Sequence, residues 1–165
     1  VFQQNSTRHR VGQEYEARGI CKHGAKYIMV QSGASVPQFT EMVNGTFGAA
    51  NYGMCGRAYD GRFIFSWPNH QIGIMGAEQA ANTLADVKIR QLERAGETPT
   101  QEEIEAIRAP VIESYARESS AYYATSHLWD DGIIDPVDTR NALGIAISAS
   151  RNTPIDEPSY GVLRL

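Results

Sequence analysis

The sequence predicts an α/β fold with mostly parallel strand pairing. Short apolar runs alternate along the chain with longer segments whose apolar residues recur at helical spacing. The chain has 165 residues, enough for one domain with a single core, and contains no internal repeat or low-complexity tract. Strands separated by helices usually pair in parallel, so we expect one α/β domain.

Two elements are expected before the glycine-rich centre of the chain. An apolar stripe over residues 12–30 predicts a helix that is loosened at Gly19 and Gly24. The segment "SVPQFTEMVNG" is rich in β-favouring residues and ends in Asn44-Gly45. It predicts a strand followed at once by a tight turn.

Four elements are expected in the middle of the chain. Residues 49–58 predict a short helix despite their glycines, and "RFIFSWP" and "QIGIMG" predict two further strands. Residues 78–93 have a strong helical pattern that ends at Gly96. The residues of this helix expected to face inward are Ala80, Ala81, Leu84, Val87 and Leu92.

Capping signals define the last two helices. Thr100 and Glu103 have the spacing of a capping box, and we expect Pro110 to interrupt the helix that they begin. The segment "LWDDGIIDPVDTRNALGIAISAS" predicts a turn, a very short apolar strand and a helix. Asp135 is expected at the N-cap of that helix and Pro136 at its first position.

Composition excludes several classes of function. The net charge is -4 and the basic residues are scattered, which argues against a nucleic-acid surface. No apolar run is long enough to span a bilayer, and the N-terminus has neither a signal-peptide core nor an initiator methionine, so we expect a soluble chain that is incomplete at its start. The cysteines, Cys21 and Cys55, are too few for a disulfide scaffold and fit a reducing compartment. No metal is expected, because four histidines lack ligand spacing: His9, His23, His70 and His127.

The stretch "NGTFGAANYGMCGRAYDGRF" offers three kinds of site. Cys55 has no identifiable partner base, which favours a packing role over a nucleophile. Residues 46–51 could cradle a phosphate but lack the Lys-Ser/Thr of a P-loop and the spacing of a dinucleotide fingerprint. A strand, a small-residue turn and a helix start would leave unpaired amides, as in an oxyanion hole. From spacing alone, a tight turn without a ligand is the favoured alternative.

Structural roles are expected for the other candidates. The acidic run over residues 130–135 could be a carboxylate pair or a metal site, but Asp135 before proline fits a helix cap and Asp131-Gly132 a turn. Packing is expected for the aromatic residues and solvation for the single basic ones, namely Tyr122, Tyr123, Trp129, Arg57, Arg62 and Lys88.

Several long motifs carry a resemblance to a known family. "YEARGICKHGAK", "NYGMCGRAY", "FSWPN", "GAEQAANTLA" and "LWDDGIIDPVDTRNALGIAISAS" together resemble the carboxyltransferase (β) subunits of 3-methylcrotonyl-CoA carboxylases, along essentially the whole chain. The resemblance implies a crotonase-like fold of repeated ββα units. It also implies that residues 1–165 are the C-terminal part of a two-domain subunit, with "PSYGVLRL" at its natural end and the N-terminal domain absent. Geranyl-CoA and propionyl-CoA or acetyl-CoA carboxyltransferases share much of the pattern.

The resemblance also implies a mechanism without a nucleophilic side chain. Carboxybiotin releases carbon dioxide, the biotin ureido group takes a proton from the acyl-CoA, and the enolate attacks the carbon dioxide. By position, the backbone amides of Ala49 and Ala50 match the family's hole for the ureido oxygen. The thioester hole and most of the acyl-CoA site would lie in the N-terminal domain. Contacts with biotin or substrate would come from Phe47, Gly48, Asn51 and Tyr52.

The resemblance implies partners as well. No Met-Lys-Met attachment motif occurs here, so the biotin would be carried by a biotin carboxylase or biotin carrier subunit. A dimer-based hexamer is expected, in the bacterial cytoplasm or the mitochondrial matrix.

This chain departs from the family pattern at three places. Arg8-His9-Arg10-Val11-Gly12 replaces the usual Gly-Phe-Met-Val-Gly and brings charge to the expected pocket edge, where it would face solvent or meet an anionic group. Ala50 stands where glycine is common and adds a methyl group beside the expected hole. Asn69-His70-Gln71 replaces a more usual Asn-Ala-Arg.

Two rival functions are consistent with the sequence. The first is a non-catalytic assembly fragment, which would require that the reading frame does not continue upstream into an N-terminal crotonase-like domain. The second is a crotonase-type hydratase or decarboxylase, since a fold does not fix the chemistry. Avidin would abolish carboxylation and leave a hydratase untouched.

Overall fold

A parallel sheet forms the centre of the molecule. The computed structural model describes residues 1–7, 9–159 and 161. Within them the sheet has the order β1-β2-β3-β5, β4 pairs with the end of β2, and all four pairings are parallel, as predicted. The strands are β1 (Phe2–Ser6), β2 (Phe39–Phe47), β3 (Phe63–Ser66), β4 (Gln71–Gly73) and β5 (Gly132–Ile133).

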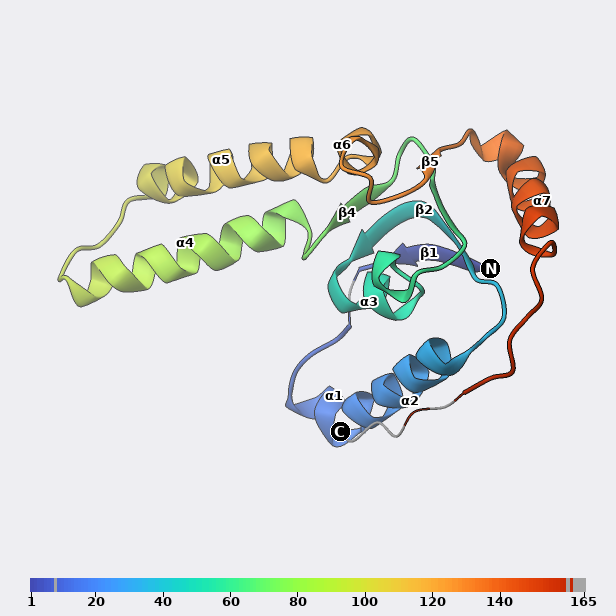
Figure 1. The fold of residues 1–165 in the computed structure, drawn as a ribbon. Coiled ribbons are helices and arrows are strands. Elements are labelled where there is room, and N and C mark those ends of the chain that lie inside the picture. The colour runs from blue at the N-terminus through green and yellow to red at the C-terminus, as the bar shows by residue number, and fades with distance from the viewer. Residues whose placement is uncertain (8, 160, 162–165) are drawn as a thin grey trace.

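The helices lie around this sheet in three groups (Figure 1). The first two helices lie below the sheet with the short α3 between, α4 and α5 form an antiparallel pair that projects to one side, and α7 lies at the opposite side (Figure 1). The helices are α1 (Gln13–Ala17), α2 (Ile20–Gly33), α3 (Gly48–Gly53), α4 (Ala77–Arg94), α5 (Gln101–Glu118), α6 (Ala121–Ser126) and α7 (Thr139–Ser150), with 3-10 turns η1 (Arg57–Tyr59) and η2 (Pro136–Asp138).

The first predicted helix is divided into α1 and α2. Gly19 has a left-handed conformation with φ of 84°, which glycine adopts without steric cost and which ends the helical path there. The loosening expected at Gly24 is wrong, since α2 runs through that residue to Gly33.

The tight turn expected at Asn44-Gly45 is also wrong. β2 continues through these residues because its second half is paired on both sides: Thr46 lies opposite Ser6 in β1 and Ile72 in β4. The chain turns at Gly48 instead, whose φ is 56°, and α3 begins there. The helix predicted for residues 49–58 is therefore α3, followed by the separate turn η1.

The α4–α5 pair is confirmed as two helices, with two corrections. Ala80 and Ala81 are buried as predicted, but Leu84 and Val87 are 51% and 54% exposed because the pair projects away from the sheet. Pro110 lies inside a continuous α5, so the expected interruption is wrong. The predicted capping box is present at the start of α5.

The capping signals predicted at Asp135 and Pro136 are present, but they begin the 3-10 turn η2 rather than α7 itself. The Asp135 side chain accepts a hydrogen bond from the Val137 amide at 3.0 Å, and Pro136 is the first residue of η2, which leads into α7. No helix of the described residues is long and apolar enough to cross a membrane.

Candidate functional site

The junction of β2 and α3 leaves backbone amides without helical partners. Phe47 is extended, Gly48 makes the left-handed turn, and no side chain caps α3. The first amides of an α-helix have no carbonyl four residues before them to bind, so those of Ala49 and Ala50 have no partner within α3. They carry the partial positive charge of a helix start and can bind an oxygen that bears negative charge.

Two cavities flank this junction. One of about 340 Å³ is lined by Ala49 and Tyr52, with an apolar wall from α2 that includes Ile20, Ala25 and Ile28. The other, of about 470 Å³, is lined by Phe47 together with residues of the segment before α1 and of α4. The structure thus brings Phe47, Ala49 and Tyr52 to surfaces that a ligand can reach.

The remaining predicted site residues do not line these two cavities. Ala50 is only 7% exposed and lines neither cavity, so Ala49 is the better placed of the two amide donors. Gly48 provides the turn. Asn51 points into the protein, where its side-chain amide donates to Gln4 Oε1 at 3.2 Å and to Thr46 Oγ1 at 3.0 Å. Asn51 therefore binds α3 to strands β1 and β2.

Gln4 is the centre of this buried polar network. It is fully buried in β1, accepts a hydrogen bond from Thr46, and donates to the Met54 carbonyl at 2.8 Å beyond the end of α3. The side chains of Gln4, Thr46 and Asn51 each find a partner within this network, which avoids the cost of an unpaired polar group there. The network joins β1, β2 and α3 at the junction. Sequence reasoning missed Gln4, because the polar segment "FQQNS" has no apolar alternation that would predict a strand.

Arginine and histidine side chains lie at both cavities. His9 and Arg10 line both the 470 Å³ cavity and the 340 Å³ cavity, so two residues of the segment that departs from the family pattern lie beside the start of α3. Arg8, the other charged residue of that departure, lies outside the described residues. The Arg10 guanidinium donates to the Tyr15 hydroxyl at 2.8 Å and lies 5.3 Å from the centre of the Tyr15 ring.

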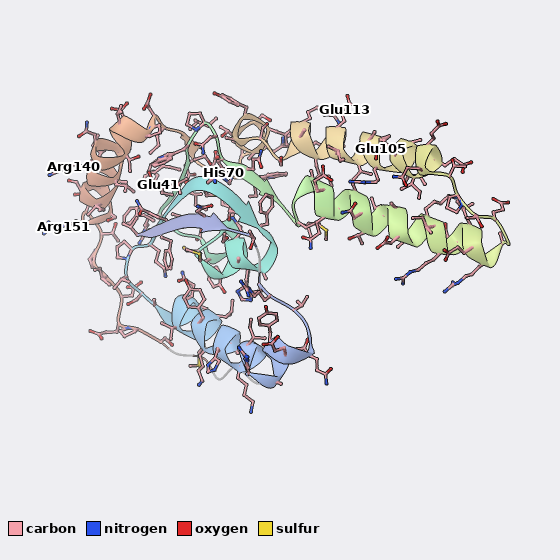
Figure 2. All side chains as sticks on the ribbon, turned by 180° about the vertical axis from the view of Figure 1, so that it is seen from behind. Glu41, His70, Glu105, Glu113, Arg140 and Arg151 are labelled. Atoms are coloured by element: carbon pink, nitrogen blue, oxygen red, sulfur yellow. The ribbon has the colours of Figure 1, made fainter. Side chains whose placement is uncertain are left out.

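His70, labelled in Figure 2, is buried beside β2. Its Nδ1 lies 2.8 Å from the Asn44 carbonyl oxygen, and its buried Nε2 has no partner among the described residues. Burial lowers the pKa of His70, and the hydrogen bond to Asn44 and the charge of Asp130 oppose this only in part. The residue is a neutral brace between β2 and the β4–α6 region.

His70 should make stability depend on pH. Because its pKa is lower in the folded protein than the unfolded value of about 6.5, the unfolded chain binds the proton more readily. The free energy of unfolding should therefore be largest above about pH 6.5 and decrease as the pH falls below it. Urea unfolding between pH 7.5 and 5.5 measures this slope. His70→Gln should flatten this slope, and an equal slope in the wild-type and variant proteins would refute the assignment.

Cys55 has the properties of a packing residue. Its side chain is fully buried, and burial raises the pKa of its thiol, which opposes the formation of a nucleophilic thiolate. The Thr40 hydroxyl donates to the Cys55 carbonyl at 2.7 Å and fixes the loop after α3.

The acidic run has structural partners. Asp130 is buried and accepts hydrogen bonds from Ser66 and Thr125. Asp131 accepts from the Ile64 amide at 2.7 Å and forms a two-pronged ion pair with Arg57. Arg57 is exposed to solvent as predicted, and the ion pair is an additional contact that the sequence did not indicate. Among the described residues, no group of His, Cys, Asp and Glu side chains could hold a metal ion.

The aromatic residues of α6 and of the loop after it differ in their surroundings: some pack together and one is exposed. Tyr123 stacks on His127 at a centroid distance of 4.2 Å and meets Trp129 edge-on at 5.8 Å, in agreement with packing. Tyr122 is 66% exposed and takes no part in this cluster.

Comparison with known proteins gives the family. Residues 1–161 match the carboxyl transferase domain. The chain belongs to this family. Over its whole length it is 47% identical to the probable mitochondrial methylcrotonoyl-CoA carboxylase β chain of Drosophila melanogaster, and 48% identical to the biotin-dependent 3-methylcrotonyl-CoA carboxylase β1 subunit of Mycobacterium tuberculosis. It spans 28% and 31% of those two proteins.

Solved structures agree with the expected fold. The β subunit of P. aeruginosa geranyl-CoA carboxylase matches 99% of this chain with a TM-score of 0.80 at 38% identity, and this chain covers 31% of it. The transcarboxylase 12S subunit, whose structure is described as a hexamer assembly, matches 98% of the chain with a TM-score of 0.78 at 27% identity, and 29% of that subunit is covered. The predicted crotonase-like α/β fold is confirmed.

Proposed function

We propose that this chain forms the biotin-facing part of a carboxyltransferase subunit of a biotin-dependent acyl-CoA carboxylase, with 3-methylcrotonyl-CoA as the favoured acceptor. The observation that carries the proposal is the uncapped start of α3, where Ala49 lines a cavity with an apolar wall. The names of relatives at 47% and 48% identity support the choice of acceptor.

The residues at this cavity fit the head group of biotin. Its ureido oxygen accepts hydrogen bonds, which the amide of Ala49 can donate, and its fused rings are largely apolar, as is the wall from α2. The volume of about 340 Å³ lies in the range of small-molecule sites. When bound, biotin would supply the carboxylate for transfer.

The role of the chain's own residues follows from this fit. The Ala49 amide stabilises negative charge on the ureido oxygen, with Ala50 as a second, less accessible donor. Gln4, Thr46 and Asn51 hold these amides in place, so that no reorganisation is needed during the reaction. Phe47 and Tyr52 form walls of the two flanking cavities.

A second acceptor, geranyl-CoA, has a specific observation in its favour. The geranyl-CoA carboxylase β subunit matches nearly the whole chain with a TM-score of 0.80. Propionyl-CoA is a weaker alternative, because the propionyl-CoA carboxyltransferase subunit of Haloferax mediterranei is 32% identical over 80% of the chain.

Further parts of the proposal concern the whole protein. We place this chain at the C-terminal end of a subunit whose N-terminal domain supplies most of the acyl-CoA site, so residues 1–165 alone should be inactive. The biotin would be attached to a biotin carboxylase or carrier subunit, and the assembly would be a hexamer. The compartment would be the mitochondrial matrix or the bacterial cytoplasm.

Carboxylation assays with the intact subunit test the proposal. The subunit and its biotinylated partner are given ATP, labelled bicarbonate and one acyl-CoA at a time. We expect the highest kcat/KM with 3-methylcrotonyl-CoA and full loss of label incorporation after addition of avidin. A preference for geranyl-CoA would overturn the acceptor. Turnover of an acyl-CoA that needs no bicarbonate and resists avidin would indicate a hydratase or decarboxylase instead.

A further inference from the structure

A permanent positive charge lies where the two cavities beside α3 share a wall. His9, Arg10 and Val11 line both the 340 Å³ and the 470 Å³ cavity. A guanidinium group stays protonated throughout the physiological pH range, so Arg10 brings a fixed positive charge to the wall that the two cavities share.

The exposed Arg10 side chain contacts Tyr15, and most of its hydrogen-bonding capacity is unused within the part of the chain that the structure describes. The Tyr15 hydroxyl accepts one hydrogen bond at 2.8 Å, and the Tyr15 ring lies 5.3 Å from the guanidinium. Arg10 has no ion pair within 4.0 Å in the part of the chain that the structure describes, although Glu16 also lines the 340 Å³ cavity. A guanidinium has five donors arranged in a fork that suits a carboxylate.

We propose that Arg10 binds a carboxylate carried on a ring nitrogen of biotin in the 340 Å³ cavity. This inference rests on the proposed function. The cavity is lined by three features: an apolar wall from α2, Ala49 at the uncapped start of α3, and the Arg10 cation. A ligand that matches all three has an apolar ring body, a neutral carbonyl acceptor and an anionic group. Carboxylated biotin has each of these, whereas unmodified biotin lacks the anion on its ring.

The arrangement gives the site a preference between two forms of one ligand. The apolar wall and the amide act on biotin in either form, but Arg10 acts only on the carboxylated form. Arg10 would thus favour entry of loaded biotin and release of spent biotin. A phosphate group of CoA is the other available anion, but its polar chain does not match the Ile20, Ala25 and Ile28 wall.

Direct binding to the intact subunit tests this without turnover. Two probes are compared by calorimetry: neutral biotin methyl ester, and biotin methyl ester with a carboxymethyl group on a ureido nitrogen, which is stable and anionic. The methyl ester removes the side-chain carboxylate that would otherwise confuse the comparison. We expect the wild-type subunit to prefer the anionic probe by roughly tenfold in Kd, the scale of one charge-assisted hydrogen-bonded pair.

Variants assign the preference to Arg10. Arg10→Gln should abolish it while leaving the Kd of the neutral probe within about twofold, and Arg10→Lys should restore part of it. Tyr15→Phe removes the hydroxyl that orients the guanidinium and should weaken the preference. Arg18→Gln is the matched control: Arg18 is an exposed arginine paired with Glu14, and its loss should leave the preference unchanged.

The outcomes separate this inference from the proposed function. If neutral biotin methyl ester binds but Arg10→Gln changes neither probe, or both equally, the inference fails and the proposed function stands. If Arg10→Gln raises only the KM for acyl-CoA, the anion belongs to CoA and the inference is overturned. If neither probe binds to the wild-type subunit, the biotin site itself is refuted and the inference with it.

Discussion

Replacing Ala49 by proline is expected to lower kcat for carboxyl transfer by roughly a hundredfold to a thousandfold, the loss typical of one oxyanion-hole donor. Proline has no amide hydrogen, so the substitution removes the proposed donor itself. Proline is well tolerated in the first turn of a helix, where that hydrogen has no helical partner, and α3 should therefore still form.

The matched control is Ala49→Ser, which keeps the amide and adds a single oxygen at an exposed position. It should retain activity within a few-fold. Circular dichroism and thermal melting of both variants establish that the fold is kept. An Ala49→Pro protein that folds normally and works as well as Ala49→Ser would remove this amide from the mechanism, and Ala50 would then be the donor to examine.

Local signals in the sequence predicted the elements that depend on local chemistry. The capping box at Thr100 and Glu103, the cap at Asp135 and the glycine end of α4 each need only a few neighbouring residues, and the structure contains all of them. The small-residue junction after β2 is also a local feature, and it indicated a strand, a turn and a helix start; Ala49 and Ala50 were named as donors only through the family resemblance.

Errors arose where partners distant in sequence decide the outcome. Asn44-Gly45 is a strong turn signal, yet pairing with β1 and β4 keeps β2 extended through it. Leu84 fits an inward helical stripe but is exposed, since α4 has only α5 alongside over that length. Asn51 looked like a ligand contact because nothing local indicates that Gln4, 47 residues away, binds its side chain.

Replacing Gln4 by leucine should destabilise the protein by about 3 kcal/mol, because it removes the hydrogen bonds that Gln4 makes within the buried network. The Met54 carbonyl loses a donor at 2.8 Å, and Thr46 and the Asn51 amide lose a shared acceptor. Urea unfolding of the intact subunit measures the loss. Asn5→Leu is the control, since Asn5 is an exposed neighbour in the same strand and should change stability little. Equal effects at both positions would mean that the network contributes nothing specific.

Gln4→Leu should also reduce kcat at temperatures where the variant is fully folded, although Gln4 touches no ligand. The network fixes α3 against β1 and β2, and a loosened α3 holds the Ala49 amide less well in line with the oxygen it stabilises. If Gln4 affects activity by positioning the Ala49 amide, Gln4→Leu should lower kcat much less in a protein that already carries Ala49→Pro. In that protein the amide donor that Gln4 positions is absent. Fully additive losses of kcat would show instead that Gln4 acts on activity by another path.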